Sequence, residues 1–266
     1  MDNELKNYQR HLKASGLAPN TAKIYIWHIK KFLLWLGNRR LTEKILRQYF
    51  DYLLKHYQKV ATINLNLIVV NQYLNYLGRR TRLDLISHKK SDLKILNPQQ
   101  LQNFLDTPLK NKTLIGYRDK ALLEMLYSTG LKVGQVSQLK IQQVGSIKKE
   151  LFLNRKNIIP LSPLTWFYLD KYLQKKSKIN PADNNYLFIN FDRAKKGMNS
   201  HLSIRSIERI INKYARKMQT PLIINPQILR NTLAYTLKNE GARSQDIAQA
   251  LHFKNKLAAK EYWQRI

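Results

Sequence analysis

The sequence predicts a mainly α-helical protein of two domains with one small antiparallel β-sheet. Apolar residues recur at helical spacing over most of the chain, and glycine or proline stands where these patterns begin or end. Residues 147–161 alternate in polarity instead, around a polar turn, as a β-hairpin does. The 266 residues, 44% of them hydrophobic, suffice for two small domains with a core each.

The first helix is expected over residues 4–15. Leu5, Tyr8 and Leu12 recur at helical spacing, and Gly16 can take the left-handed conformation that ends a helix. A second helix is expected over residues 20–36, closed by Gly37. Its inward-facing residues are expected to be Ile24, Trp27, Phe32 and Leu36, with His28, Lys30 and Lys31 on other faces.

Two further helices complete a four-helix domain expected over residues 1–80. Thr42 is a suitable N-cap for the third helix, and Glu43 is favourably placed by the helix dipole. The apolar positions of that helix are Ile45, Tyr49, Leu53 and Leu54. The fourth helix is expected over residues 62–77, before Gly78.

Residues 79–97 lose the apolar period and carry several basic side chains. We interpret residues 81–97 as a basic linker that lies along an anionic partner, with a linker that is basic only for solubility as the alternative.

The second domain is expected over residues 98–266. Asn97 and Pro98 suit a helix start, and a helix over residues 116–129 ends at Gly130. After the hairpin, helices are expected over residues 163–176 and 203–218, with a short buried strand or extended segment at residues 186–189 between them.

The chain carries a large excess of positive charge, with 47 Lys and Arg against 17 Asp and Glu and a net charge of +30. This excess indicates a polyanionic partner, and nucleic acid is the first expectation. A merely solvated cationic surface, or a biased genome, is the alternative. Clustering favours nucleic acid, and the clusters include Lys30-Lys31, Arg79-Arg80, Lys89-Lys90, Lys148-Lys149, Arg155-Lys156, Lys175-Lys176 and Lys195-Lys196.

Composition also limits the possible classes. The chain has no cysteine, which excludes disulfides and thiolate zinc sites, and its six histidines show no paired ligand spacing. We therefore expect no metal and no cofactor. No apolar run reaches membrane-spanning length and the first residues are acidic and polar, so an intracellular, cytoplasmic protein is expected.

Three chemically useful residues stand near the C-terminal end, each on its own predicted helix. Arg230 lies in residues 225–232 (Asn-Pro-Gln-Ile-Leu-Arg-Asn-Thr) on a face expected to point inward with Leu233, His252 follows the next helix, and Tyr262 lies on the last. An arginine fork, an imidazole and a phenol are suited to holding a phosphodiester beside a nucleophile.

This stretch resembles the active site of the tyrosine recombinase (phage-integrase, Xer-type) family. That family shows His-x-x-Arg, then Leu-Gly-His, then a nucleophilic tyrosine. Arg230, His252 and Tyr262 match, and Gln227 stands at the first histidine. Residues 130–135 (Gly-Leu-Lys-Val-Gly-Gln) resemble the family's Gly-Leu-Arg-x-x-Glu, with Lys132 at the arginine and Gln135 at the glutamate.

The resemblance covers residues 4–263. Residues 16–21 and 61–64 look like the family's core-binding domain, so it implies an N-terminal SAM-like four-helix core-binding domain and a C-terminal catalytic-type domain. The family also carries a catalytic lysine in its hairpin. A gapless match sets Phe152 there, whereas a shortened turn would let Arg155 or Lys156 substitute.

The resemblance implies cutting and rejoining of double-stranded DNA without metal, through a 3′-phosphotyrosyl intermediate. The catalytic residues it implies are Tyr262, Arg230, His252, Lys132, Gln227 and Lys156. Residues expected at DNA phosphates are Lys30, Lys31, Arg79, Arg80, Lys89, Lys90 and Arg155. A weakly active recombinase, a DNA-binding protein without the chemistry, and, from charge alone, an RNA-binding protein remain open.

Two details of the C-terminal end bear on activity and assembly. Tyr262 falls ten residues after His252, one more than the usual family spacing, and four residues follow it. In the family a longer tail commonly docks into a neighbouring protomer. We therefore expect a homo- or hetero-oligomer, a tetramer on DNA, with weak coupling between protomers, associated with the nucleoid.

Overall fold

The computed structural model describes residues 2–87, 92–110, 112–154, 157–178, 185–191, 201–218, 222–253 and 255–266. The chain divides into two compact units, Met1–Lys90 and Ser91–Ile266. The predicted class is confirmed, since the described part is mainly helical and holds one three-stranded antiparallel sheet. None of its helices is both long and apolar enough to cross a membrane.

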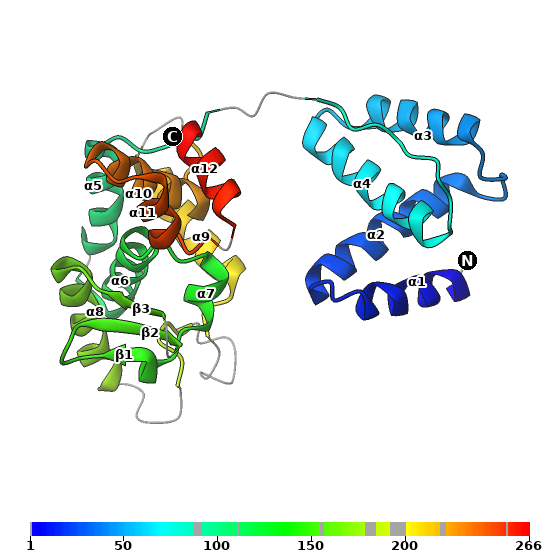
Figure 1. Ribbon diagram of the computed structural model, residues 1–266. Coiled ribbons are helices and arrows are strands. Elements are labelled where there is room, and N and C mark those ends of the chain that lie inside the picture. The colour runs from blue at the N-terminus through cyan, green and yellow to red at the C-terminus, as the bar shows by residue number, and fades with distance from the viewer. Residues whose placement is uncertain are drawn as a thin grey trace. The chain divides into compact units, whose positions relative to one another are not determined.

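The first unit is a bundle of four helices (Figure 1), α1 Asp2–Ala14, α2 Pro19–Leu36, α3 Glu43–His56 and α4 Val60–Tyr76. The expected ends are confirmed at Gly16, where φ is +74°, and at Thr42, whose Oγ1 accepts a hydrogen bond from the backbone N of Ile45. Buried side chains from all four helices, among them Leu12, Phe32, Leu53 and Leu67, form the core of this unit.

The predicted inner face of α2 is partly wrong. Phe32 and Leu36 are buried, but Ile24 is exposed and Trp27 is 52% exposed, with the Lys31 ammonium 3.8 Å from the centre of its ring. His28 is buried instead, because its Nδ1 donates to Asn66 Oδ1 on α4 at 2.8 Å, and a buried imidazole with a partner costs little.

On α3, Tyr49 and Leu53 are buried as expected. Leu54, another apolar position of this helix, is exposed.

The segment after α4 is fixed to the first unit. The Asn71 side chain accepts from the backbone N of Leu83 and donates to its carbonyl, both at 2.8 Å, and Asn64 does the same for Ile86 at 2.9 Å. Two side-chain amides therefore replace a β-ladder partner and hold this strip of extended backbone against α4.

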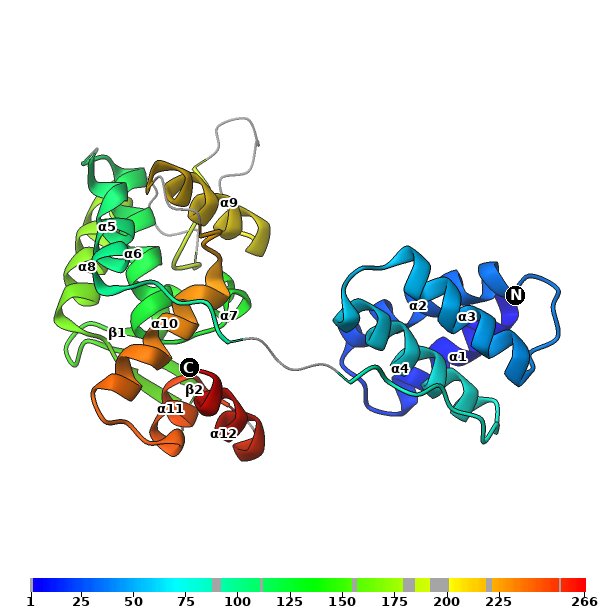
Figure 2. The same cartoon turned by 90° about the horizontal axis from the view of Figure 1, so that it is seen from above.

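The second unit contains eight α-helices and the sheet among its described residues (Figure 2). The helices are α5 Pro98–Asp106, α6 Leu114–Ser128, α7 Val133–Gln138, α8 Pro163–Ser177, α9 Ile204–Ala215, α10 Pro226–Asn239, α11 Ser244–Ala250 and α12 Lys256–Arg265. Short 3₁₀ turns η1 Thr107–Lys110, η2 Ile141–Gln143 and η3 Arg216–Met218 connect some of them.

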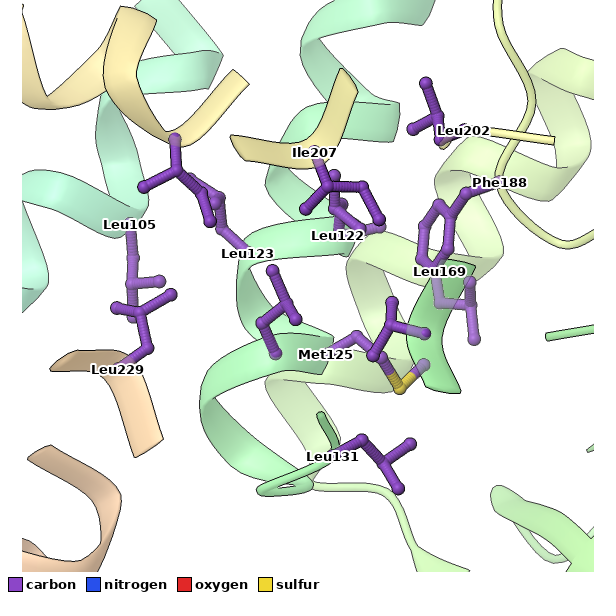
Figure 3. Packing of buried hydrophobic residues seen from close by; sticks show 14 of the residues in the cluster. Leu105, Leu122, Leu123, Met125, Leu131, Leu169, Phe188, Leu202, Ile207 and Leu229 are labelled. Carbon is purple, nitrogen blue, oxygen red and sulfur yellow. The ribbon is translucent and has the colours of Figure 1, made fainter. Parts of the chain in front are cut away.

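Helix α6 is the centre of this unit. Its Leu122, Leu123 and Met125 are fully buried among side chains from α8, α9 and α10, including Leu169, Ile207 and Leu229 (Figure 3). Because α6 is covered on most sides, its C-terminal end is held rigidly. The turn at Gly130, which follows that end directly, is therefore held in place too.

The predicted hairpin is present. The sheet order is β1 Val144–Gly145, β2 Glu150–Asn154, β3 Asn157–Pro160, with Leu151 opposite Ile159 and Phe152 opposite Ile158. Phe152 also lies over Gly145, where a Cβ would meet its ring at 2.7 Å. Arg155 and Lys156, the residues expected to replace the hairpin lysine, lie outside the described residues.

Candidate active site at the C-terminal helices

Helix α10 positions Arg230 in the interior. Asn225 caps the helix through a hydrogen bond from the backbone N of Ile228, and Pro226 follows it, so the start of the helix is well defined. One helical turn later, the Arg230 side chain is only 6% exposed. The inward position predicted for Arg230 and Leu233 is confirmed.

The Arg230 guanidinium is incompletely paired. Its Nη2 donates to the carbonyl of Leu251 at 3.0 Å, whereas its buried Nη1 has no hydrogen-bond partner in the described part of the chain. Burial lowers the pKa of Arg230, and the nearby Tyr262 phenol acts in the opposite direction. An arginine keeps its charge under such conditions, so a buried cation is left with donors directed at no anion.

Tyr262 on α12 lies beside this guanidinium. Its side chain is 9% exposed, and its hydroxyl donates to Oδ1 of Asn231 at 2.5 Å. Burial raises the pKa of Tyr262, while the charge of Arg230, a hydrogen bond with Gln227 and the charge of Arg265 lower it. Three predicted site residues, Tyr262, Arg230 and Gln227, are therefore brought together.

Asn231 was not predicted as a site residue. Its Oδ1 accepts from the Gln227 side-chain amide at 2.9 Å as well as from Tyr262, and its Nδ2 donates to the carbonyl of Lys94 at 3.0 Å. The only signal in the sequence is a polar residue directly after Arg230 on a buried stretch of helix.

His252 follows α11 in an unusual backbone conformation. Its φ is +53°, and the backbone N atoms of His252 and Phe253 return to the carbonyls of Gln249 and Ala248. This is the left-handed helix ending that glycine usually provides. The His252 ring Nε2 lies 3.2 Å from the carbonyl of Thr129, and because a carbonyl only accepts, Nε2 carries the hydrogen.

The environment of His252 favours its neutral form. Burial lowers the pKa of the imidazole, the hydrogen bond with Thr129 raises it, and the charge of Arg230 lowers it again. The net direction is downward.

Gly130 brings the end of α6 against the end of α11. A Cβ at this residue would lie 2.7 Å from the carbonyl oxygen of Ala250 and 2.8 Å from a methyl carbon of Leu251. Lys132, two residues later, is exposed, and its backbone N donates to Oε1 of Gln135 at 3.0 Å. Gln135 thus holds the backbone of Lys132 through an amide oxygen.

Phe253 is a second residue that sequence reasoning missed. Its ring centroid lies 5.2 Å from that of Tyr262, with the two planes tilted by 54°. Phe253 and His252 also line a cavity of about 680 Å³ that is bounded by Thr129, Gln135, α11 and strand β3. Tyr262 and Arg230 are not among its lining residues.

The residues predicted at DNA phosphates are only partly described. Lys30 and Lys31 are exposed on α2, and Arg79 and Arg80 are exposed after α4, all in the first unit. Lys89, Lys90 and Arg155 lie outside the described residues. Among the residues that the structure describes, no three His, Asp or Glu side chains group as metal ligands would.

Comparison with known proteins identifies relatives of this chain. The model of the phage integrase family matches residues 94–265. Tyrosine recombinase XerA of Pyrococcus horikoshii is 25% identical over 259 residues, which cover 94% of this chain and 85% of that protein.

Two solved structures share the fold. The Tn1549 transposon integrase in complex with circular intermediate DNA has a TM-score of 0.76 at 14% identity, covering 98% of this chain and 94% of the integrase chain. A lambda integrase dimer bound to a COC′ core site has a TM-score of 0.72 at 14% identity, covering 99% and 77%. Because the family match spans well over half of the chain, the protein belongs to the phage integrase family, that of the tyrosine recombinases.

Proposed function

We propose that the protein binds double-stranded DNA and cuts one strand slowly by attack of the Tyr262 hydroxyl on a phosphodiester. The observation that carries this proposal is the buried Arg230 guanidinium, whose Nη1 has no partner in the described chain, beside the Tyr262 phenol. A buried cation without an anion is costly, and a phosphate oxygen would satisfy the free donor with a charge-assisted bond.

The proposed reaction balances without a further reagent. The Tyr262 oxygen forms a bond to phosphorus as its proton is lost, and the bond from phosphorus to the 5′ oxygen breaks. The leaving oxygen takes a proton and departs as a 5′-hydroxyl. The 3′-phosphotyrosyl bond keeps the energy of the phosphodiester, so attack by a 5′-hydroxyl reverses the steps and rejoins a strand.

Slow chemistry follows from the residues around the phenol. Lys132 supplies charge but not the bidentate fork of an arginine, and Gln227 donates a hydrogen bond but carries no proton. Loss of one preorganised donor costs roughly a hundredfold to a thousandfold in rate. Losses at groups that act together do not simply multiply.

We also propose a corrected assignment for the second histidine of the motif. His252 has the left-handed backbone that suits the glycine of Leu-Gly-His, and Phe253 stands nine residues before Tyr262. With Phe253 at the histidine position, the distance to Tyr262 is the nine residues usual in the family, whereas the distance from His252 is ten. Phe253 then occupies the histidine position, with its ring against Tyr262, and provides no proton or hydrogen bond there.

The proposed partner is duplex DNA, held by phosphate contacts from Lys30, Lys31, Arg79, Arg80 and the other predicted basic residues. Relatives such as the Tn1549 integrase have been solved in complex with DNA, which supports the proposal. Assembly as a homo- or hetero-oligomer on DNA, and action at the nucleoid in the cytoplasm, are part of it.

A second candidate function is DNA binding without cleavage, in a structural or regulatory role. It is favoured by the combination of Lys132, Gln227 and Phe253 at three positions where the family motif has catalytic side chains.

Covalent trapping separates the two. Duplexes that the purified protein selects from a random pool supply the site, and a nick beside the cleavage position lets the short 5′-hydroxyl fragment diffuse away. We expect a covalent protein–DNA adduct that resists SDS, is lost in Tyr262→Phe, and persists in Tyr127→Phe, which removes a partly buried phenol elsewhere. A tightly bound duplex that gives no adduct would support the second candidate.

Restoring the motif tests why cleavage is slow. The variants Lys132→Arg, Gln227→His and Phe253→His, made singly and together, should each raise the rate of adduct formation, by up to about a hundredfold for a donor that is recovered in the correct position. If the triple variant forms adduct no faster than the parent, the substitutions do not limit the reaction and the position of Tyr262 does.

A further inference from the structure

We infer that Asn231 is a positioning residue for the Tyr262 hydroxyl and ties it to the backbone of residues 93–96. Its role toward the nucleophile rests on the proposed function, whereas the link itself is a matter of geometry. The Asn231 side chain is 4% exposed and makes three hydrogen bonds, so almost all of its bonding capacity is used inside the protein.

The orientation of the Asn231 amide is determined by its partners. Nδ2 faces the carbonyl of Lys94, which can only accept. Oδ1 must therefore be the atom that faces Tyr262, and it accepts a hydrogen bond from the phenol O–H. A neutral amide cannot accept that proton in full, so Asn231 holds the hydroxyl in place without acting as a base.

The backbone of residues 93–96 contacts both helices of the site. The backbone N of Leu96 donates to Thr232 Oγ1 on α10 at 2.9 Å, and the backbone N of Leu93 donates to the carbonyl of Arg265 on α12 at 3.3 Å. Movement of residues 93–96 would therefore displace α10, which carries Asn231, and α12, which carries Tyr262, together. These residues lie close to the start of the second unit, which begins at Ser91.

Neighbouring Thr232 offers a matched control. It is buried, lies on the same helix and binds the same strip, but no hydrogen bond joins it to Tyr262. A purely structural role for the strip predicts that Thr232→Val and Asn231→Ala behave alike. A positioning role predicts that only the Asn231 variants change the pKa of the Tyr262 phenol.

The test is titration of the Tyr262 phenol by NMR in the full chain labelled at tyrosine Cζ, with the signal assigned by its loss in Tyr262→Phe. The charges that act on the phenol are Arg230 and Arg265. Asn231→Ala removes the acceptor that favours the protonated phenol and admits water, so the pKa of Tyr262 should fall. Asn231→Asp places a carboxylate there, so the pKa should rise. Thr232→Val should leave it unchanged.

Adduct formation gives the second readout. Asn231→Ala should slow trapping about a hundredfold, the scale expected for misplacing a reacting group by about 1 Å, with DNA affinity unchanged. Equal effects of Asn231→Ala and Thr232→Val, or Tyr262 titrating alike in all variants, would overturn the inference even if cleavage occurs. Absence of adduct in every variant, with opposite shifts in the alanine and aspartate variants, would refute the proposed cleavage and leave the link intact. If Asn231→Ala does not fold, Asn231→Asp is compared with Thr232→Val: the carboxylate has no N–H for the carbonyl of Lys94, so it should raise the pKa of Tyr262 and also slow trapping, and behaviour equal to that of Thr232→Val would overturn the inference.

Discussion

Gly130 is the residue on which the meeting of α6 and α11 depends. It has φ of +60°, and an added Cβ would clash with backbone as well as side chain. Gly130→Ala should lower the free energy of unfolding by about 1–2 kcal/mol for the conformation, plus about 1–3 kcal/mol for the overlap. Gly16→Ala is the control, since φ is +74° there but nothing lies within 4 Å of the added atom. Urea denaturation of both variants checks this, and equal losses would mean that the close approach is unimportant.

His252 should make stability depend on pH. Its folded pKa is lowered, chiefly by burial, from an ordinary value of 6.5. The unfolded chain therefore takes up a proton first as the pH falls, and the free energy of unfolding declines below about pH 6.5 until the folded imidazole is protonated too. His252→Asn, which tolerates positive φ, should flatten this decline. Denaturation curves from pH 7.5 to 5 compare the two proteins, and parallel curves would contradict the expectation.

The site could be predicted from sequence only where the signal is local. Arg230 shares a helix face with Leu233 that is expected to point inward, and both residues are buried. Asn231 could not be recognised, because its partners at positions 94 and 262 are far away in the chain. The conformation of His252 was hidden too, since a left-handed histidine has no pattern of its own.

Helix ends were easier to predict than helix faces. The helices expected to stop at Gly16, Gly37, Gly78 and Gly130 do so, because a local steric property decides the ending. On α2, apolar side chains occur on nearly all sides, so spacing alone fits several faces. The face that is buried carries His28, which pairs with the distant Asn66, and Trp27 is left exposed.

The two hydrogen bonds of Asn71 should hold the segment after α4 against the first unit. Asn71→Ala removes both bonds to Leu83 and leaves a backbone N–H and C=O unpaired, which should cost about 1–3 kcal/mol of unfolding free energy. Trypsin should then cut faster after Arg82. The control is Asn75→Ala, whose one side-chain bond, with Arg82, is exposed. Equal cleavage of both variants would show that the amide pair does not hold the strip.

Composition and periodicity predicted the fold class better than they predicted the site. Net charge and helical periodicity depend on sums over many residues, so single exceptions such as Trp27 do not disturb them. Catalytic geometry depends on a few side chains from distant parts of the chain. The fold class was therefore accessible from sequence, whereas the network of Tyr262, Asn231 and Lys94 was not.

The net charge of +30 predicts a steep salt dependence of DNA binding. Each neutralised phosphate releases counterions and adds about 0.9 to the slope of log affinity against log salt, so several contacts imply a loss of roughly a thousandfold between about 50 and 200 mM salt. Arg79→Ala with Arg80→Ala should reduce the slope by about two on every duplex. Arg79→Lys with Arg80→Lys should keep it, because counterion release counts charge and not the shape of the donor. Fluorescence anisotropy across salt concentrations measures the slopes; if the alanine pair matches the parent, these two arginines do not contact phosphate, and the positive charge that binds DNA lies elsewhere on the chain.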